Sequence, residues 1–249
     1  MRRTGPVQIT ERDRKVMKFA FEQRAISYDQ IRCRLFESTK RPTVQYRLGR
    51  LVRDGYLSKI GIPSGGSLEL IYGLTEKGFN VVRKDYRFEI TQAYFKSDSY
   101  LHDVALTDIR TRLEKSAMFE DYISENMLQA CGELTTSLEY GPFGTVNADA
   151  VLVLRGQEKS FRLALEFEAS EKSGVRYGKK LTEYYFSHDI VAALYVCGDA
   201  RIEKSIRRVD SEFESQFEPK IYTCTMDVVR SGASPLPFTN RKNATFLLR

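Results

Sequence analysis

The chain has no tryptophan, only two histidines and four cysteines, and no long uninterrupted hydrophobic run. The cysteines lie far apart and show neither CxxC nor Cys/His spacing, so they indicate neither a zinc site nor a disulfide framework. The two histidines supply too few ligands for a zinc site of their own. No apolar stretch approaches the length of a membrane span, and residues 1–10 contain no hydrophobic signal segment. These absences favour a cytoplasmic chain without a membrane partner.

Positive charge is concentrated in the first third of the sequence. The 249 residues suffice for one large domain or two of ordinary size, and a hydrophobic content of 42% supplies ample core material. Residues 1–86 contain 18 Lys and Arg against 9 Asp and Glu, a net charge of +9, whereas residues 87–249 contain 21 against 24, a net charge of −3. The basic part therefore favours a nucleic-acid partner, although a basic surface can also serve solubility alone.

Residues 10–53 contain three segments that are typical of helices. Thr10 is placed to cap the first segment. Ser27 and Gln30 have the spacing of a capping box at the start of the second, in which each side chain bonds to a backbone N–H of the other. In the third, Pro42 suits the first helical turn, where no N–H is needed.

Two strand patterns follow, over residues 56–60 and 68–74, on either side of a tip rich in glycine and serine. Thr75 is then placed to cap a fourth helical segment. Helices followed by a two-stranded hairpin are the order of a winged helix-turn-helix. We therefore predict a DNA-binding domain of this kind over residues 1–86.

The third helical segment is the one expected to enter the major groove of double-stranded DNA. Val44, Leu48, Leu51 and Val52 recur at helical spacing and are expected to pack inward. The outward face is then expected to carry Thr43, Tyr46, Arg50 and Arg53, with Arg47 on its flank. Arginine can bond bidentately to guanine, and threonine and tyrosine can contact bases or phosphates. The alternative is a solvated helix in a protein-binding winged helix.

Further candidates lie at the start of this helix and in the hairpin. Residues at a helix N-terminus are well placed for phosphate, which the helix dipole favours. A glycine tip allows the backbone to approach DNA closely. The full set of predicted DNA-binding residues is Lys40, Arg41, Thr43, Gln45, Tyr46, Arg47, Arg50, Arg53, Lys59, Ser64 and Gly65.

A polar stretch, residues 87–99, is predicted to link this domain to a second one over residues 100–249. The second domain opens with a helical pattern at Tyr100 and then contains a segment whose structure the pattern does not decide. Two strands, a helix, a strand, a helix and a strand follow, with a last strand at the C-terminus. This order indicates a mixed α/β domain whose apolar runs suit central strands, and the whole chain is expected to have an α+β fold.

Three carboxylates fall on the two neighbouring strands of the second domain. Alternation places Glu166 and Glu168 on one face of their strand, and Asp149 lies where the preceding strand begins. Carboxylate oxygens are ligands that Mg²⁺ prefers, so these three residues are candidate metal ligands. In the alternative interpretation they form a polar sheet face, neutralised by a basic side chain of the next helix: Lys172, Arg176, Lys179 or Lys180.

Several of these segments together resemble the replication-relaxation family. They are the winged-helix pattern, the helical segment LHDVALTDIRTRLE, the strand NADAVLVL, and LALEFEAS with the basic segment GKKLTEYY after it. The resemblance covers most of residues 10–210. It implies a protein of plasmids or other mobile elements, in which a winged helix precedes a degenerate PD-(D/E)XK nuclease-like domain.

The resemblance also assigns roles to the carboxylates. An active PD-(D/E)XK nuclease has an acid on one strand and an acid-x-lysine on the next; Asp149 and Glu166 match the acids, but Glu168 stands at the lysine position. Because that lysine orients or activates the attacking water, the departure favours a retained scaffold over a working nuclease. A nuclease would need Mg²⁺ at Asp149, Glu166 and Glu168, and a lysine from farther along the chain: Lys172, Lys179 or Lys180.

We therefore expect a DNA-binding protein of a mobile genetic element, acting as a transcriptional regulator or as an accessory factor in replication or transfer, without a cofactor. The alternative is a Mg²⁺-dependent DNA endonuclease targeted by its winged helix. A small-molecule sensor is a third interpretation, but no phosphate-binding glycine loop supports it. Winged-helix regulators commonly dimerise on paired half-sites, so a homodimer, or a protein partner held by the second domain, is also expected.

Overall fold

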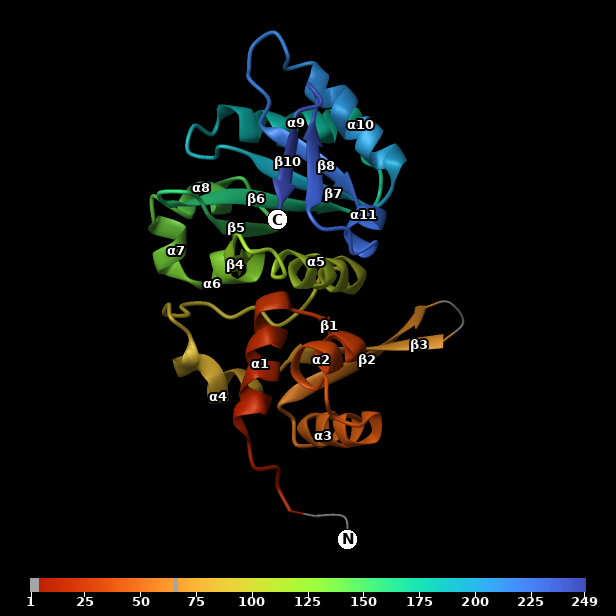
Figure 1. The fold of residues 1–249 in the computed structure, drawn as a ribbon. Coiled ribbons are helices and arrows are strands. Elements are labelled where there is room, and N and C mark those ends of the chain that lie inside the picture. The colour runs from red at the N-terminus through yellow and green to blue at the C-terminus, as the bar shows by residue number, and fades with distance from the viewer. Residues whose placement is uncertain (1–4, 65–66) are drawn as a thin grey trace. The chain divides into compact units, whose positions relative to one another are not determined.

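The computed structural model describes residues 5–64 and 67–249 (Figure 1). The chain forms two compact units, unit 1 over residues 1–108 and unit 2 over residues 109–249. Helix α5 (Tyr100–Leu113) runs across the division between them. Within the described part of the chain, no helix has both the length and the apolar composition needed to cross a bilayer.

Unit 1 begins with the three helices that the sequence predicts, α1 (Glu11–Gln23), α2 (Tyr28–Leu35) and α3 (Arg41–Arg53). Both predicted caps are confirmed. Thr10 and Asp13 form a capping box at α1, and Ser27 and Gln30 form one at α2. Pro42 lies in the first turn of α3. Local side-chain chemistry therefore sets where these helices begin.

A β-hairpin follows the helices and forms most of a small antiparallel sheet (Figure 1). Its strands are β2 (Leu57–Ser64) and β3 (Ser67–Leu74), and the short strand β1 (Ile26–Ser27) pairs with β3, so the order is β1-β3-β2. Strand β2 continues four residues past the end predicted at residue 60. Thr75 caps α4 (Glu76–Val82), as predicted, and the 3₁₀ turn η1 (Arg83–Asp85) follows.

The core of unit 1 draws on its α-helices and its strands, whereas the turn η1 contributes no buried residue. Val44, Leu48 and Leu51 of α3 are fully buried, as their helical spacing predicts, whereas Val52 is only partly buried. Residues 87–99 contain no helix or strand, but apolar side chains among them pack on the rest of unit 1. Ile90 is buried, and the Phe95 ring lies beside the rings of Phe21 and Phe79.

Unit 2 is built on a seven-stranded mixed sheet of order β10-β9-β8-β7-β6-β5-β4. Strands β6, β7 and β8 are parallel, and the other neighbouring pairs are antiparallel. The strands are β4 (Phe119–Ser124), β5 (Ala150–Arg155), β6 (Ser160–Glu168), β7 (Ala193–Cys197), β8 (Ile221–Thr225), β9 (Leu236–Asn240) and β10 (Thr245–Leu248). Parallel neighbours need crossover connections, and helices supply them here.

The crossover helices are α9 (Gly174–Phe186), between β6 and β7, and α10 (Ala200–Ser211), between β7 and β8. They pack against each other, and α10 also packs on β7 and β8. The short helices are α6 (Glu125–Ala130), α7 (Gly132–Thr136), α8 (Gly141–Thr145) and α11 (Met226–Arg230). The mixed α+β fold is thus as expected, whereas the sequence pattern did not define β4, β9 or these short helices.

Candidate functional site

Helix α3 presents a continuous exposed stripe on the side opposite its buried residues. The stripe follows helical spacing and consists of Pro42, Gln45, Tyr46, Gly49 and Arg53. Tyr46 is 46% exposed, which is unusual for so large a ring. Among the described residues, no atom outside the nearby backbone of α3 itself lies within 4 Å of the place where a Cβ on Gly49 would stand, so these residues leave the middle of the stripe open. A groove of matching shape could approach the helix backbone closely at this point.

Other predicted DNA-binding residues lie around the start of this stripe. Lys40 and Thr43 are exposed there. The Arg41 side chain is 63% exposed and lies 3.3 Å from Asp29, and the Arg53 side chain, at the far end, is 52% exposed and lies 2.7 Å from Asp54. Exposed pairs of this kind are weak and screened by salt. Both guanidinium groups can therefore exchange their partner for a phosphate at little cost.

Arg50 does not face outward, so that expectation was wrong. Arg50 is only 9% exposed, and its Nη2 donates to the carbonyl of Gly5 at 2.7 Å. Val7 is buried as well, and its N–H donates to Oδ2 of Asp54 at 2.7 Å. The segment before α1 thus crosses this side of α3 and covers it. Helical periodicity could not reveal this, because the covering residues come from outside the helix.

Arg47 is also committed to the protein itself. Its Nε donates to Oδ1 of Asp13 at 2.9 Å, its Nη2 donates to the carbonyl of Gln8 at 2.6 Å, and a second contact joins Nη2 to Oδ2 of Asp13. Asp13 is 1% exposed. Burial raises the pKa of this carboxyl, but the bonds from Arg47 and Thr10 outweigh it and hold the pKa below its usual value. Arg47 therefore ties α3 to α1.

The hairpin contributes both charge and apolar surface. Lys59 is exposed on β2, and Ser64 is the last residue of that strand. Gly65, predicted at the hairpin tip, lies outside the described residues. Two apolar side chains on the hairpin are also open to solvent, Ile60 at 42% and Leu68 at 68%. Neither side chain was predicted from the sequence to be functional. Leu68 lies near the start of β3, beyond the part of that strand whose side chains are buried.

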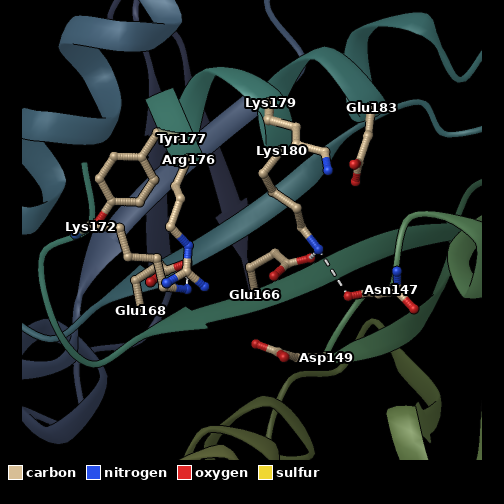
Figure 2. Close-up of a pocket in the computed structure, with 10 residues that line it drawn as sticks. All are labelled: Asn147, Asp149, Glu166, Glu168, Lys172, Arg176, Tyr177, Lys179, Lys180 and Glu183. Carbon is tan, nitrogen blue, oxygen red and sulfur yellow. Dashed lines mark hydrogen bonds and ion pairs between the residues drawn. The ribbon is translucent and has the colours of Figure 1, made fainter. Parts of the chain in front are cut away.

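Unit 2 contains a pocket of about 400 Å³ where β6 and the start of β5 face α9 (Figure 2). The pocket contains all six residues predicted for a nuclease site: Asp149, Glu166, Glu168, Lys172, Lys179 and Lys180. Its lining is Asn147, Asp149, Glu166, Glu168, Lys172, Arg176, Tyr177, Lys179, Lys180 and Glu183. Of these, Asn147, Tyr177 and Glu183 were not foreseen. The position of Glu183, one turn after Lys179 on the same side of α9, was the signal available for it.

Glu166 lies at the floor of this pocket and is almost completely buried. Nζ of Lys180 lies 2.9 Å from its Oε1, and the Tyr184 hydroxyl donates to the same oxygen. Lys180 also donates to the carbonyls of Val146 at 2.7 Å and Asn147 at 2.9 Å. Burial, followed by repulsion from Asp149, raises the pKa of Glu166 to about 8 despite these partners.

The other two carboxylates are also engaged. Nζ of Lys172 lies 2.7 Å from Oε1 of Glu168, and the backbone N–H of Phe167 donates to Oδ2 of Asp149 at 2.7 Å. Across residues 5–64 and 67–249, no three His, Cys, Asp or Glu side chains are grouped so that they could hold a metal ion. Asp149, Glu166 and Glu168 therefore do not form the triad considered for Mg²⁺. The two glutamates instead pair with Lys180 and Lys172, as the alternative interpretation expects.

Fold and site define an α+β protein in which a unit of helices and a β-hairpin precedes a mixed sheet with a charged pocket. Residues 19–190 match the family model described as replication-relaxation. The chain belongs to the replication-relaxation family, which confirms the resemblance noted in the sequence. This membership suggests an association with the replication or transfer of a mobile element. No curated protein and no solved structure matches the chain.

Proposed function

We propose that the chain is a DNA-binding protein of a mobile genetic element and reads double-stranded DNA with the exposed stripe of α3. The single observation that carries this proposal is the stripe itself, because it is polar, open at Gly49, and set in the more basic part of the chain. Gln45 can pair with adenine, and Arg53 with guanine or a phosphate. The protein would act as a transcriptional regulator or as an accessory factor in replication or transfer.

Unit 1 would bind as a winged helix-turn-helix. The order of α1, α2 and α3 before the β2–β3 hairpin, and the pairing of β1 with β3, support this proposal. In such a domain α3 enters the major groove, and the hairpin, with Lys59 and the exposed Leu68, lies against the neighbouring backbone or minor groove. The ion pair of Arg47 and the buried Arg50 would hold α3 in position without touching DNA themselves.

The proposal is tested by a mobility-shift assay with DNA from upstream of the protein's own gene. The combined variant Gln45→Ala/Tyr46→Ala/Arg53→Ala removes three exposed side chains of the stripe and no core contact. Because each base contact is worth about 1–3 kcal/mol, we expect affinity to fall by about 100-fold or more. The control variant Asn80→Ala/Lys84→Ala changes exposed polar residues of α4 and η1 in the same unit, and should bind as the wild type does. If the triple variant binds DNA as tightly as the control variant does, the exposed residues of α3 do not contact the DNA.

Gly49 gives a second prediction, in which stability and binding change in opposite directions. A glycine within a helix costs about 0.5–1 kcal/mol relative to alanine, and a Cβ at Gly49 meets no atom of another described segment within 4 Å. Gly49→Ala should therefore stabilise unit 1 by about this amount in urea unfolding. The added methyl group would nevertheless stand between α3 and the groove, so DNA affinity should fall. A variant that is both more stable and equally tight in binding would place Gly49 outside the DNA contact.

We further propose that unit 2 is a degenerate PD-(D/E)XK nuclease-like domain. Its support is that Asp149 precedes one strand and Glu166 lies on the next, while Glu168 stands at the lysine position. Because the side chains of Lys180 and Lys172 already occupy oxygens of the two glutamates, we expect supercoiled plasmid to stay intact with purified protein and Mg²⁺ or Mn²⁺. Nicking by the wild type that is lost in Asp149→Ala would instead establish the endonuclease alternative.

A further inference from the structure

Of the four cationic side chains that line the unit 2 pocket, two form ion pairs with other described residues and two do not. Lys180 and Lys172 are paired with the two glutamates, at 2.9 Å and 2.7 Å. By contrast, the side chains of Arg176 and Lys179 make no hydrogen bond or ion pair with any residue that the structure describes. Both residues are exposed. The pocket therefore presents two cations without an ion-pair partner at its helix side, although the carboxylates of Asp149 and Glu183 also line it.

Helix α9 holds these charges on a rigid support. The Ser173 side chain caps its first turn by accepting from the N–H of Arg176 at 3.3 Å. Tyr177 and Leu181 are buried and anchor the helix on the sheet side. Figure 2 shows the Arg176 side chain extending from α9 toward the strand that carries Glu168. A ligand at this position would meet the guanidinium group without a rearrangement of the backbone.

The opposite side of the pocket carries groups of a different kind. Asn147 has a left-handed backbone, with φ of 50°, and its carbonyl is fixed by Lys180 at 2.9 Å. Its side-chain amide is exposed and can both donate and accept. Asp149 adds a carboxylate on the same side (Figure 2). The pocket thus offers cations to one end of a ligand, and an amide with an acceptor to the other.

We propose that this pocket binds a nucleotide that carries a phosphomonoester, either free or as the 5′ end of a DNA strand. The phosphate would lie against Arg176 and Lys179, since a guanidinium group bonds phosphate oxygens in pairs and Lys adds a point charge. The base or sugar would lie toward Asn147 and Asp149, whose oxygens accept from amino and hydroxyl groups. The pocket volume of about 400 Å³ lies within the range of small-ligand sites. This site is separate from α3 and does not depend on the proposed reading of duplex DNA.

The test uses fluorescence anisotropy of a short labelled oligothymidine strand, carrying either a 5′-phosphate or a 5′-hydroxyl. The full chain is used with the α3 changes Gln45→Ala/Tyr46→Ala/Arg53→Ala, so that binding through unit 1 does not mask the pocket. We expect the phosphorylated strand to bind about ten-fold more tightly, or more, because of its charge-assisted bonds. Competition by free dTMP identifies a free-nucleotide site; phosphate discrimination without such competition identifies a strand-end site.

Two variants complete the experiment. Arg176→Ala/Lys179→Ala should abolish the preference for the 5′-phosphate. The matched variant Lys204→Ala/Arg230→Ala also removes two exposed cations of unit 2, but away from the pocket, and should keep it. The proposal is overturned if neither strand end is preferred and dTMP does not compete, or if the preference survives in Arg176→Ala/Lys179→Ala. Neither result would affect duplex binding by the unmodified α3, which is measured separately.

Discussion

Replacing Arg47 by methionine is expected to destabilise unit 1 by about 3–5 kcal/mol, the usual cost of removing one partner of a buried ion pair. The change leaves the carboxylate of Asp13, which is 1% exposed, without its cation, and it also removes the bond to the carbonyl of Gln8. The methionine side chain keeps an unbranched apolar stem similar to that of arginine and removes only the charged group. Urea unfolding followed by circular dichroism measures the loss.

Two comparisons make the Arg47 result specific. Arg41→Met removes an arginine of the same helix whose side chain is 63% exposed, and should cost less than about 1 kcal/mol. Adding Asp13→Asn to Arg47→Met removes the unpaired charge, so part of the stability should return. If Arg47→Met unfolds at the same urea concentration as the wild type, the ion pair of Arg47 and Asp13 contributes little to stability. Loss of DNA binding in an Arg47 variant would report unfolding rather than a lost base contact.

The stability of unit 2 is expected to fall as pH rises from about 5 to 8. In this range the unfolded state loses the carboxyl proton of Glu166, whereas the folded state retains it. Its pKa is raised from 4.5 to about 8, chiefly by burial. A raised carboxyl pKa means that the folded state binds more protons than the unfolded state between these values, so stability is fully present below 4.5 and declines above it. The difference between these two pKa values corresponds to at most about 5 kcal/mol in the free energy of unfolding.

Glu166→Gln tests this expectation because glutamine resembles the protonated side chain in shape and cannot ionise. The variant should lose most of the pH dependence and be the more stable protein at pH 8. Hydrogen exchange of the β6 peptide, measured from pH 5 to pH 8 and corrected for the intrinsic rate, follows unit 2 alone. Glu183→Gln is the matched control, since Glu183 lines the same pocket but is only partly buried. A Glu166→Gln profile parallel to that of the wild type would contradict the raised pKa.

Features set by residues close in sequence could be predicted. The capping boxes at Thr10 and Ser27 involve residues three positions apart, so the starts of α1 and α2 followed from the sequence. The buried side of α3 followed from helical spacing in the same way. Strand β9 did not, because it is short, follows Pro235 and contains Pro237, and proline argues against a strand. Its pairing with β8 and β10 depends on residues elsewhere in the chain.

The two candidate sites also combine features that local sequence predicts with features that depend on distant residues. The sequence brought Asp149, Glu166 and Glu168 into one region, because strand alternation and order place them there. It could not decide which lysine pairs with which glutamate, since Lys172 lies before α9 and Lys180 lies two turns within it. It also could not show that residues 5–8 cover Arg50, a contact between segments more than 40 positions apart. Long-range packing therefore separates the structural arginines of α3 from the exposed ones.

The most direct test of the central claim compares the affinity of the protein for its preferred duplex with its affinity for a scrambled duplex at one fixed salt concentration. If the stripe of α3 reads base edges, Gln45→Ala/Tyr46→Ala/Arg53→Ala should lose most of the preference for the specific duplex and keep weaker binding through phosphate contacts. The control Asn80→Ala/Lys84→Ala should keep the full preference. A triple variant that is folded and still discriminates between the two duplexes as the wild type does would contradict the account.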